Sequence, residues 1–94
     1  TVGHNVIIIG EVKIEDGAVI GMGSILNDGA VVKKNSIVAA KSFVKKNTTV
    51  KKETVYGGNP SKFMRAVRKE EFKYFSEGQK IYEQLTEQYK IIAK

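Results

Sequence analysis

The chain has 94 residues, 41% of them hydrophobic, and a formal net charge of +6. This length suits a single domain, and the absence of cysteine excludes disulfides and thiolate metal sites. No apolar run reaches the roughly 18 residues that a membrane-spanning helix needs, and no signal-peptide pattern opens the sequence. We therefore expect no membrane partner and, since a chain without cysteine is compatible with a reducing compartment, a cytoplasmic location.

The positive charge is spread evenly along the chain. Residues 1–60 hold eight lysines and five acidic residues, and residues 61–94 hold eight lysines or arginines and five glutamates. Aromatic residues do not alternate with the lysines, so neither half has the stacking surface that single-stranded nucleic acids require. We expect a solvated charged surface and no nucleic-acid partner.

From Val2 onward the sequence repeats every six residues. The first position of the hexad holds a branched aliphatic residue in nine of ten consecutive hexads and Tyr56 in the tenth. The fourth position is Gly or Asn seven times, and the fifth is small or β-branched through Thr54. A period of six fits neither a helix nor an ordinary strand. It fits a short strand followed by a tight corner, where Gly and Asn adopt positive φ at little cost.

Three such hexads make one three-sided coil of 18 residues. Stacked coils would lie at the inter-strand spacing of roughly 4.8 Å, so that each side becomes a parallel sheet. The predicted inward columns are Val2, Ile20, Val38 and Tyr56; Ile8, Leu26 and Val44; and Ile14, Val32 and Val50. Because no coil buries its faces alone, stability must come from the stacking.

The repeat ends at the sequence YGGNPSKFMR. Pro60 cannot donate to a β-ladder and suits a chain that leaves the sheet, so we expect a turn or short helix at residues 61–68. A longer helix is predicted from Lys69 to Ile92, because apolar residues recur there at helical spacing. The predicted organisation is therefore β-helix coils over residues 1–60, followed over 61–94 by an exit turn and a C-terminal helix packed on the coils.

Two stretches, VGHNVIIIGEVKIEDGAVIGMGSILNDGAVV and VYGGNPSKFMR, resemble the γ-class carbonic anhydrase family of hexapeptide-repeat proteins. Many acyltransferases share the hexads, whereas the IGMGSIL run and the Tyr-x-Gly-x-Pro-x-Lys-x-x-Arg exit are more specific to the γ class. The resemblance implies a mainly β fold, with a left-handed parallel β-helix of about three coils followed by a C-terminal α-helix. It also implies a homotrimer.

The same resemblance suggests where a metal would bind. In the family, zinc or another divalent metal lies between subunits and is held by three histidines, and the enzyme reversibly hydrates CO2 to bicarbonate. Gly3-His4 matches the family's Gly-His corner, which makes His4 the candidate metal ligand. Tyr56 matches a tyrosine near the metal and is the candidate catalytic residue. Five residues after His4, where the family has another histidine, this chain has Ile9.

Ile9 makes the predicted metal site incomplete. A catalytic zinc needs about three protein ligands, isoleucine cannot provide one, and His4 is the only histidine in the chain. We therefore predict that the metal is absent or needs further ligands, and that this chain is inactive alone. The alternative roles are a structural corner residue for His4 and the last packed rung of its column for Tyr56.

Three functions remain open at this point. The first is a γ-carbonic anhydrase-like protein acting on CO2 and bicarbonate. The second is a hexapeptide acyltransferase that uses acyl-CoA, although such enzymes need a catalytic histidine on or near a protruding loop and no insertion interrupts these hexads. The third is a non-catalytic subunit of a trimeric assembly, since an open sheet end near Val2 would favour association.

Overall fold

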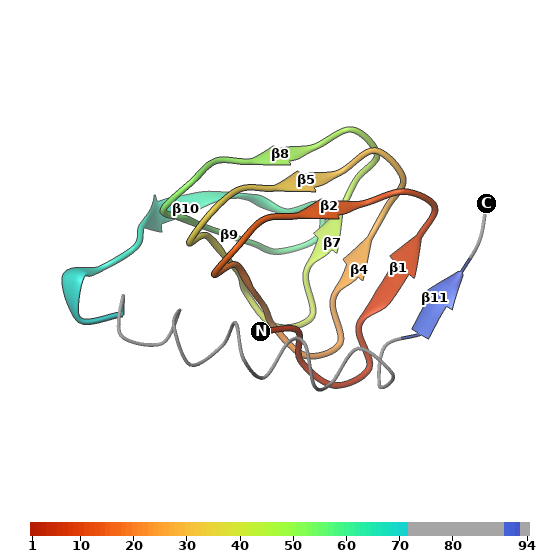
Figure 1. Ribbon diagram of the computed structural model, residues 1–94, viewed down its shortest axis with the longest axis horizontal. Coiled ribbons are helices and arrows are strands. Elements are labelled where there is room, and N and C mark those ends of the chain that lie inside the picture. The colour runs from red at the N-terminus through yellow and green to blue at the C-terminus, as the bar shows by residue number, and fades with distance from the viewer. Residues whose placement is uncertain (72–89, 93–94) are drawn as a thin grey trace.

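The computed structural model describes residues 1–71 and 90–92. Short strands follow one another around a three-sided coil (Figure 1). The strands of the coils are β1 (Ile7–Ile9), β2 (Lys13–Ile14), β3 (Val19–Ile20), β4 (Ile25–Leu26), β5 (Val31–Val32), β6 (Ile37–Val38), β7 (Phe43–Val44), β8 (Thr49–Val50) and β9 (Thr54–Gly57). They are followed by β10 (Lys62–Ala66), a 3-10 helix η1 (Lys69–Glu71) and β11 (Lys90–Ile92).

The strands form three sheets, one for each side of the coil. Their orders are β11-β1-β4-β7, β10-β9-β6-β3 and β2-β5-β8. Every pairing is parallel except that between β9 and β10. Within the coils the paired residues are 18 apart, as in Ile8 with Leu26 and Ile14 with Val32. The predicted mainly β fold with parallel stacked coils is therefore confirmed.

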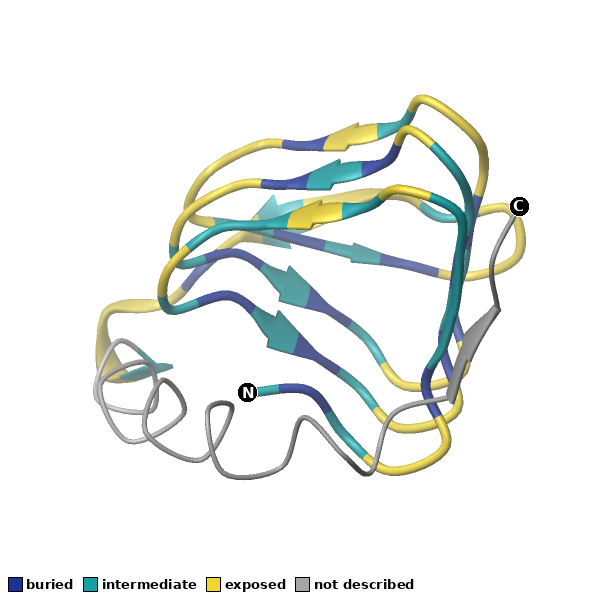
Figure 2. Cartoon of the chain, turned by 45° about the vertical axis from the view of Figure 1, so that its right-hand side comes forward, coloured by how far each residue is buried: buried dark blue, intermediate teal, exposed yellow. Residues whose placement is uncertain are grey.

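The three predicted inward columns are also confirmed. Val2 pairs with Ile20, Ile20 with Val38 and Val38 with Tyr56, and the other two columns pair in the same way. Leu26, Val32 and Val38 are fully buried, and Figure 2 shows buried segments recurring on each side of the coil. Burying each such side chain stabilises the fold by about 1.5–3 kcal/mol.

The corners adopt the positive φ that the Gly and Asn positions predict. Asn5, Asn35, Asn47, Gly17, Gly23 and Gly29 all have φ between 54° and 82°. Lys41 and Glu53 take the same conformation at φ 58° and 57° although neither residue type favours it. That conformation costs roughly 1–2 kcal/mol at a residue with a Cβ, so the stacking of the neighbouring coils imposes the corner there.

The expectation of a turn or short helix at residues 61–68 is wrong. Residues Lys62–Ala66 form β10, which pairs antiparallel with β9 and places Phe63 beside Tyr56. Pro60, preceded by a cis peptide bond, lies in the turn between the two strands, where its missing N–H does not interrupt the ladder. The turn also contacts β7, because Phe43 N–H donates to the Gly58 carbonyl and Ser61 N–H donates to the Phe43 carbonyl.

The predicted C-terminal helix is wrong at its described C-terminal end. Its start, Lys69–Glu71, is a 3-10 helix, and its end, Lys90–Ile92, is β11, which runs parallel to β1. Two consecutive isoleucines favour a strand, and the outer edge of β1 supplies hydrogen-bonding partners. The rest of the predicted helix falls at residues 72–89, outside the described residues, so its packing on the coils stays a prediction.

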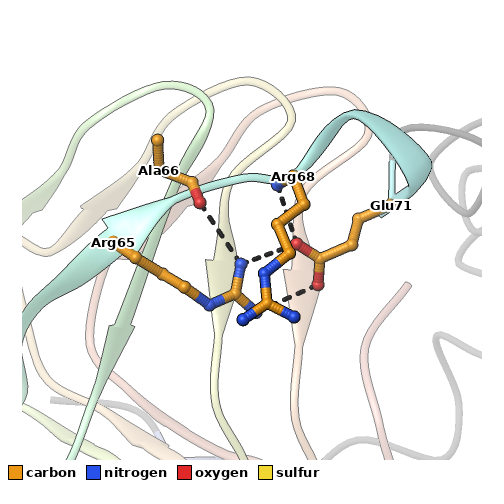
Figure 3. A network of polar contacts seen from close by, with 4 residues as sticks. All are labelled: Arg65, Ala66, Arg68 and Glu71. Carbon is orange, nitrogen blue, oxygen red and sulfur yellow. Dashed lines mark hydrogen bonds and ion pairs between the residues drawn. The ribbon is translucent and has the colours of Figure 1, made fainter.

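An arginine–glutamate pair holds the segment between β10 and η1 (Figure 3). The Glu71 carboxylate accepts hydrogen bonds from Arg65 Nη1 at 2.7 Å and Nη2 at 3.1 Å, and from the Arg68 backbone N–H at 2.8 Å. The Arg65 side chain, followed by the Arg68 N–H, lowers the pKa of Glu71 to about 2. This bidentate pair closes the first turn of the chain that follows the hairpin.

Candidate functional site

His4 lies on the corner between β3's sheet and β1's sheet, at the first coil. The imidazole is exposed, and the next residue, Asn5, has φ 59°. The Gly23 N–H donates to the His4 carbonyl at 2.9 Å, so the backbone of this corner is fixed against the coil above. A Cβ on Gly3 would lie 2.7 Å from the Met22 nitrogen. The Gly-His corner therefore has a structural reason: only glycine allows this close approach of the two coils.

Ile9 ends β1, on the side that follows the His4 corner. Its side chain is half-buried, and its backbone pairs with Ile92 of β11. The position at which the family resemblance expects a second histidine thus lies on a regular strand, without a donor atom for a metal. The site remains as incomplete in the structure as it is in the sequence.

Tyr56 lies on β9 and continues the column of Val2, Ile20 and Val38. It is half-buried against the core, and its ring meets Phe63 edge-on, with centroids 6.1 Å apart and an interplanar angle of 82°. Three coil steps of roughly 4.8 Å separate it from the coil of His4. One subunit therefore does not bring His4 and Tyr56 together. The contact of Tyr56 with Phe63 was not predicted from the sequence, because strand β10 was not predicted.

Within residues 1–71 and 90–92, no group of three or more His, Cys, Asp or Glu side chains could hold a metal ion. A zinc ion at His4 would need donors from outside the described residues or from another subunit. The donor set present in these coils does not fit the metal that the resemblance implies.

The corner that carries His4 also presents Met22 and Ala40, one and two coils further on. We call it the methionine corner and define it by His4, Met22, Ala40 and Met64. Met22 and Met64 are 57% and 59% exposed. Met64, on β10, lies beside this corner, since a Cβ on Gly57 would lie 2.7 Å from its sulfur and 3.0 Å from the Cβ of Ala39, the residue before Ala40. Two exposed methionines on or beside this corner make it the candidate protein contact surface.

A groove of about 590 Å³ lies elsewhere, at the first coil. It is lined by Ile8, Gly10, Glu11, Val12, Lys13, Ile14, Gly29, Ala30 and Val31. Neither His4 nor Tyr56 contributes to it. The concave surface at this end of the coils is thus separate from both candidate site residues.

Comparison with solved structures identifies relatives of these coils. A Bacillus cereus protein described as an acetyltransferase aligns with a TM-score of 0.78 and 32% identity, over 88% of this chain and 48% of that one. A hexapeptide transferase family protein from Anaplasma phagocytophilum aligns with a TM-score of 0.75 and 32% identity, over 86% and 49%. No model of a known protein family matches the sequence.

Comparison of the sequence with characterised proteins finds a relative with a higher sequence identity than these structures. The chain is 48% identical over 82 residues to gamma carbonic anhydrase 2, mitochondrial, from Arabidopsis thaliana. This chain is a γ-carbonic anhydrase-like hexapeptide-repeat protein. The match covers 87% of the chain but only 29% of the plant protein, so activity, substrates and partners of a γ-carbonic anhydrase-like protein remain proposals here.

Location is not decided by these relatives. The plant protein is mitochondrial by name, and the cytoplasmic location expected for this γ-carbonic anhydrase-like chain stays a prediction. Among the described residues, no helical segment combines the length and the hydrophobicity of a membrane-spanning helix.

Proposed function

We propose that this chain is a subunit of a γ-carbonic anhydrase-like homotrimer, and that its own residues do not complete the metal site for reversible CO2 hydration. The left-handed coil and the trimer are part of this proposal and rest on the family resemblance. The observation that carries it is the single exposed imidazole of His4, with Ile9 in place of a second ligand. Zinc-dependent conversion of CO2 to bicarbonate would then require ligands from outside the described residues, and this chain alone should be inactive.

Restoring the missing donor tests the metal part of this proposal. We expect Ile9→His to raise zinc affinity about tenfold or more over the unmodified chain, because a second imidazole adds a ligand that zinc favours. Zinc affinity would be measured by calorimetric titration and CO2 hydration by stopped-flow spectrophotometry. Unmodified chain should show no zinc-dependent hydration.

Two further variants make this test specific. Ile25→His places the same substitution on β4, next to Ile7 of β1, and should leave zinc affinity near that of the unmodified chain. His4→Ala in the Ile9→His background should cancel the gain. Zinc-dependent hydration by the unmodified chain would contradict the proposal.

The methionine corner is the surface that we expect at the trimer contact. A partner subunit would bury Met22 and Met64, and a lysine in that surface would leave an unpaired charge at the contact. We expect Met22→Lys to lower the mass measured by light scattering to that of a monomer. The exposed position should keep the free energy of unfolding of the subunit within about 0.5 kcal/mol. A trimer that persists with Met22→Lys would place the contact on another surface.

A hexapeptide acyltransferase is the second candidate function. It is favoured by the coil geometry shared with the Bacillus cereus and Anaplasma phagocytophilum proteins. Such an activity requires acyl-CoA, so calorimetric titration with acetyl-CoA separates the two functions. Binding that is followed by acetyl transfer would favour this candidate. Absence of both, together with a stable trimer, would favour the third candidate, a non-catalytic assembly subunit.

A further inference from the structure

Two lysine pairs are stacked on the corner between β5's sheet and β6's sheet. Lys33-Lys34 follows β5 and Lys51-Lys52 follows β8, and the register of Val32 with Val50 places the pairs one coil apart. The Lys33 N–H donates to the Val50 carbonyl at 2.9 Å, which fixes the backbones against each other. All four side chains are exposed. Charge counting alone predicts only a solvated face for these lysines, although their separation of 18 residues already predicts the stacking.

These lysines surround a groove, which we call the lysine groove. It has a volume of about 540 Å³ and is lined by Glu15, Lys33, Lys34, Thr49, Lys51 and Lys52. Such a volume lies within the range of roughly 300–1,000 Å³ that small-molecule sites occupy. The groove is on a different corner from His4, so its occupancy does not depend on a metal.

The charges around the lysine groove are unbalanced. Glu15 is the one acidic residue among the six that line it. Its Oε2 lies 3.9 Å from Lys33 Nζ, and its Oε1 accepts a hydrogen bond from the Lys34 N–H at 3.1 Å. Asp16 and Glu53 flank the same corner without lining the groove. Glu15 therefore offsets one of four ammonium groups, and the lining keeps a net positive charge.

Stacking like charges on neighbouring strands is unfavourable. An anion with several negative charges would relieve the repulsion and accept hydrogen bonds from more than one ammonium group. Lysine binds phosphate as a point charge, with three rotatable donors that adapt to the position of the oxygens. Thr49 adds a hydroxyl donor at the same surface.

We propose that the lysine groove binds a ligand that carries several phosphate groups. The Lys34, Lys51 and Lys52 ammonium groups bind phosphate oxygens, while Glu15 holds Lys33 beside them. A free oligophosphate compound and a phosphorylated lipid headgroup share this chemistry. The two sources are separated by experiment.

The first arm titrates the chain with sodium tripolyphosphate by calorimetry at low ionic strength. We expect binding that Lys34→Gln/Lys52→Gln weakens about tenfold or more, since each variant residue removes a charged donor. The matched control is Lys45→Gln/Lys46→Gln. It removes two lysines, and so the same amount of positive charge, from a Lys-Lys-Asn sequence on another corner. Those two lysines do not line the lysine groove, and their removal should change the affinity by less than about twofold.

The second arm measures sedimentation with vesicles of phosphatidylcholine containing phosphatidylinositol bisphosphate. If the unmodified chain binds the vesicles but not tripolyphosphate, and only Lys34→Gln/Lys52→Gln loses vesicle binding, the proposal is supported with a lipid headgroup as the source. Loss of tripolyphosphate binding in that variant alone supports it with a free compound as the source. Equal losses in both double variants, or no binding in either arm, overturn it.

A thermal measurement guards against a variant that does not fold. Tripolyphosphate should raise the melting temperature of the unmodified chain above its value in sodium chloride of equal ionic strength, because a ligand that binds only the folded state stabilises it. The same rise with the Lys45→Gln/Lys46→Gln variant is expected. No rise in the unmodified chain, together with no binding to the vesicles, would also overturn the proposal.

Discussion

The methionine corner and the corner of the lysine groove share one backbone design but present opposite surfaces. Both turn the chain through a residue at positive φ, Asn5 or Gly23 in the first and Asn35 or Glu53 in the second. The methionine corner leaves almost no space between coils, so that Gly3 and Gly21 are needed there. The second corner projects long charged side chains into solvent. The stacked columns therefore fix the backbone of each corner, while the side chains on it are available for function.

The largest effect should come from a charge in the columns that both corners depend on. Val38 is fully buried between Ile20 and Tyr56, so Val38→Asp would leave an unpaired carboxylate in the core. We expect the free energy of unfolding to fall by more than about 4 kcal/mol, enough to abolish a cooperative thermal melt followed by circular dichroism. Val31→Asp, which is on β5 and only half-buried, is the control and should keep a cooperative melt. A melt near that of the unmodified chain for Val38→Asp would contradict the column assignment.

A smaller effect should distinguish the two corners themselves. A Cβ on Gly21 would lie 2.6 Å from the Ala40 Cα, so Gly21→Ala forces two coils apart at the methionine corner. We expect a loss of about 1–3 kcal/mol in the free energy of unfolding, measured by urea denaturation. Lys34→Ala, on the open corner, should change it by less than about 0.5 kcal/mol. Equal losses for the two variants would mean that the close approach of the coils is not specific to the methionine corner.

The smallest effect concerns the Arg65–Glu71 pair beyond the coils. Because the folded pKa of Glu71 is lowered to about 2, its contribution to stability is fully present above the ordinary glutamate pKa of about 4.3 and is lost as the pH falls toward 2. Glu71→Gln should therefore lower the free energy of unfolding slightly at pH 6. It should also remove part of the decrease in the free energy of unfolding that the unmodified chain shows between pH 4.5 and 2. Urea denaturation at several pH values measures both changes. Glu70→Gln, an exposed neighbour, should keep the acid dependence of the unmodified chain.

The candidate site could be predicted only in part. The sequence identified the Gly3-His4 corner and the missing donor at Ile9, and the structure adds that His4 is exposed and that no metal-binding cluster exists in residues 1–71 and 90–92. The contact of Tyr56 with Phe63 could not be predicted, because it depends on β10. The lysine groove was predictable in position, since hexads 18 residues apart must stack, but its shape depends on how Glu15 and the lysine stems pack.

The coils follow directly from the hexad repeat, because stacking buries its aliphatic first positions and brings residues such as Ile20 and Val38 together. The conformation of the two segments beyond the coils depends instead on the strands that lie next to them in the fold. The Lys62–Ala66 segment carries no repeat, and its strand conformation comes from the free edge of β9. The Lys90–Ile92 segment likewise becomes a strand beside β1. Local sequence is a weak guide at such places, because a strand at a sheet edge is stabilised by hydrogen bonds to residues far away along the chain.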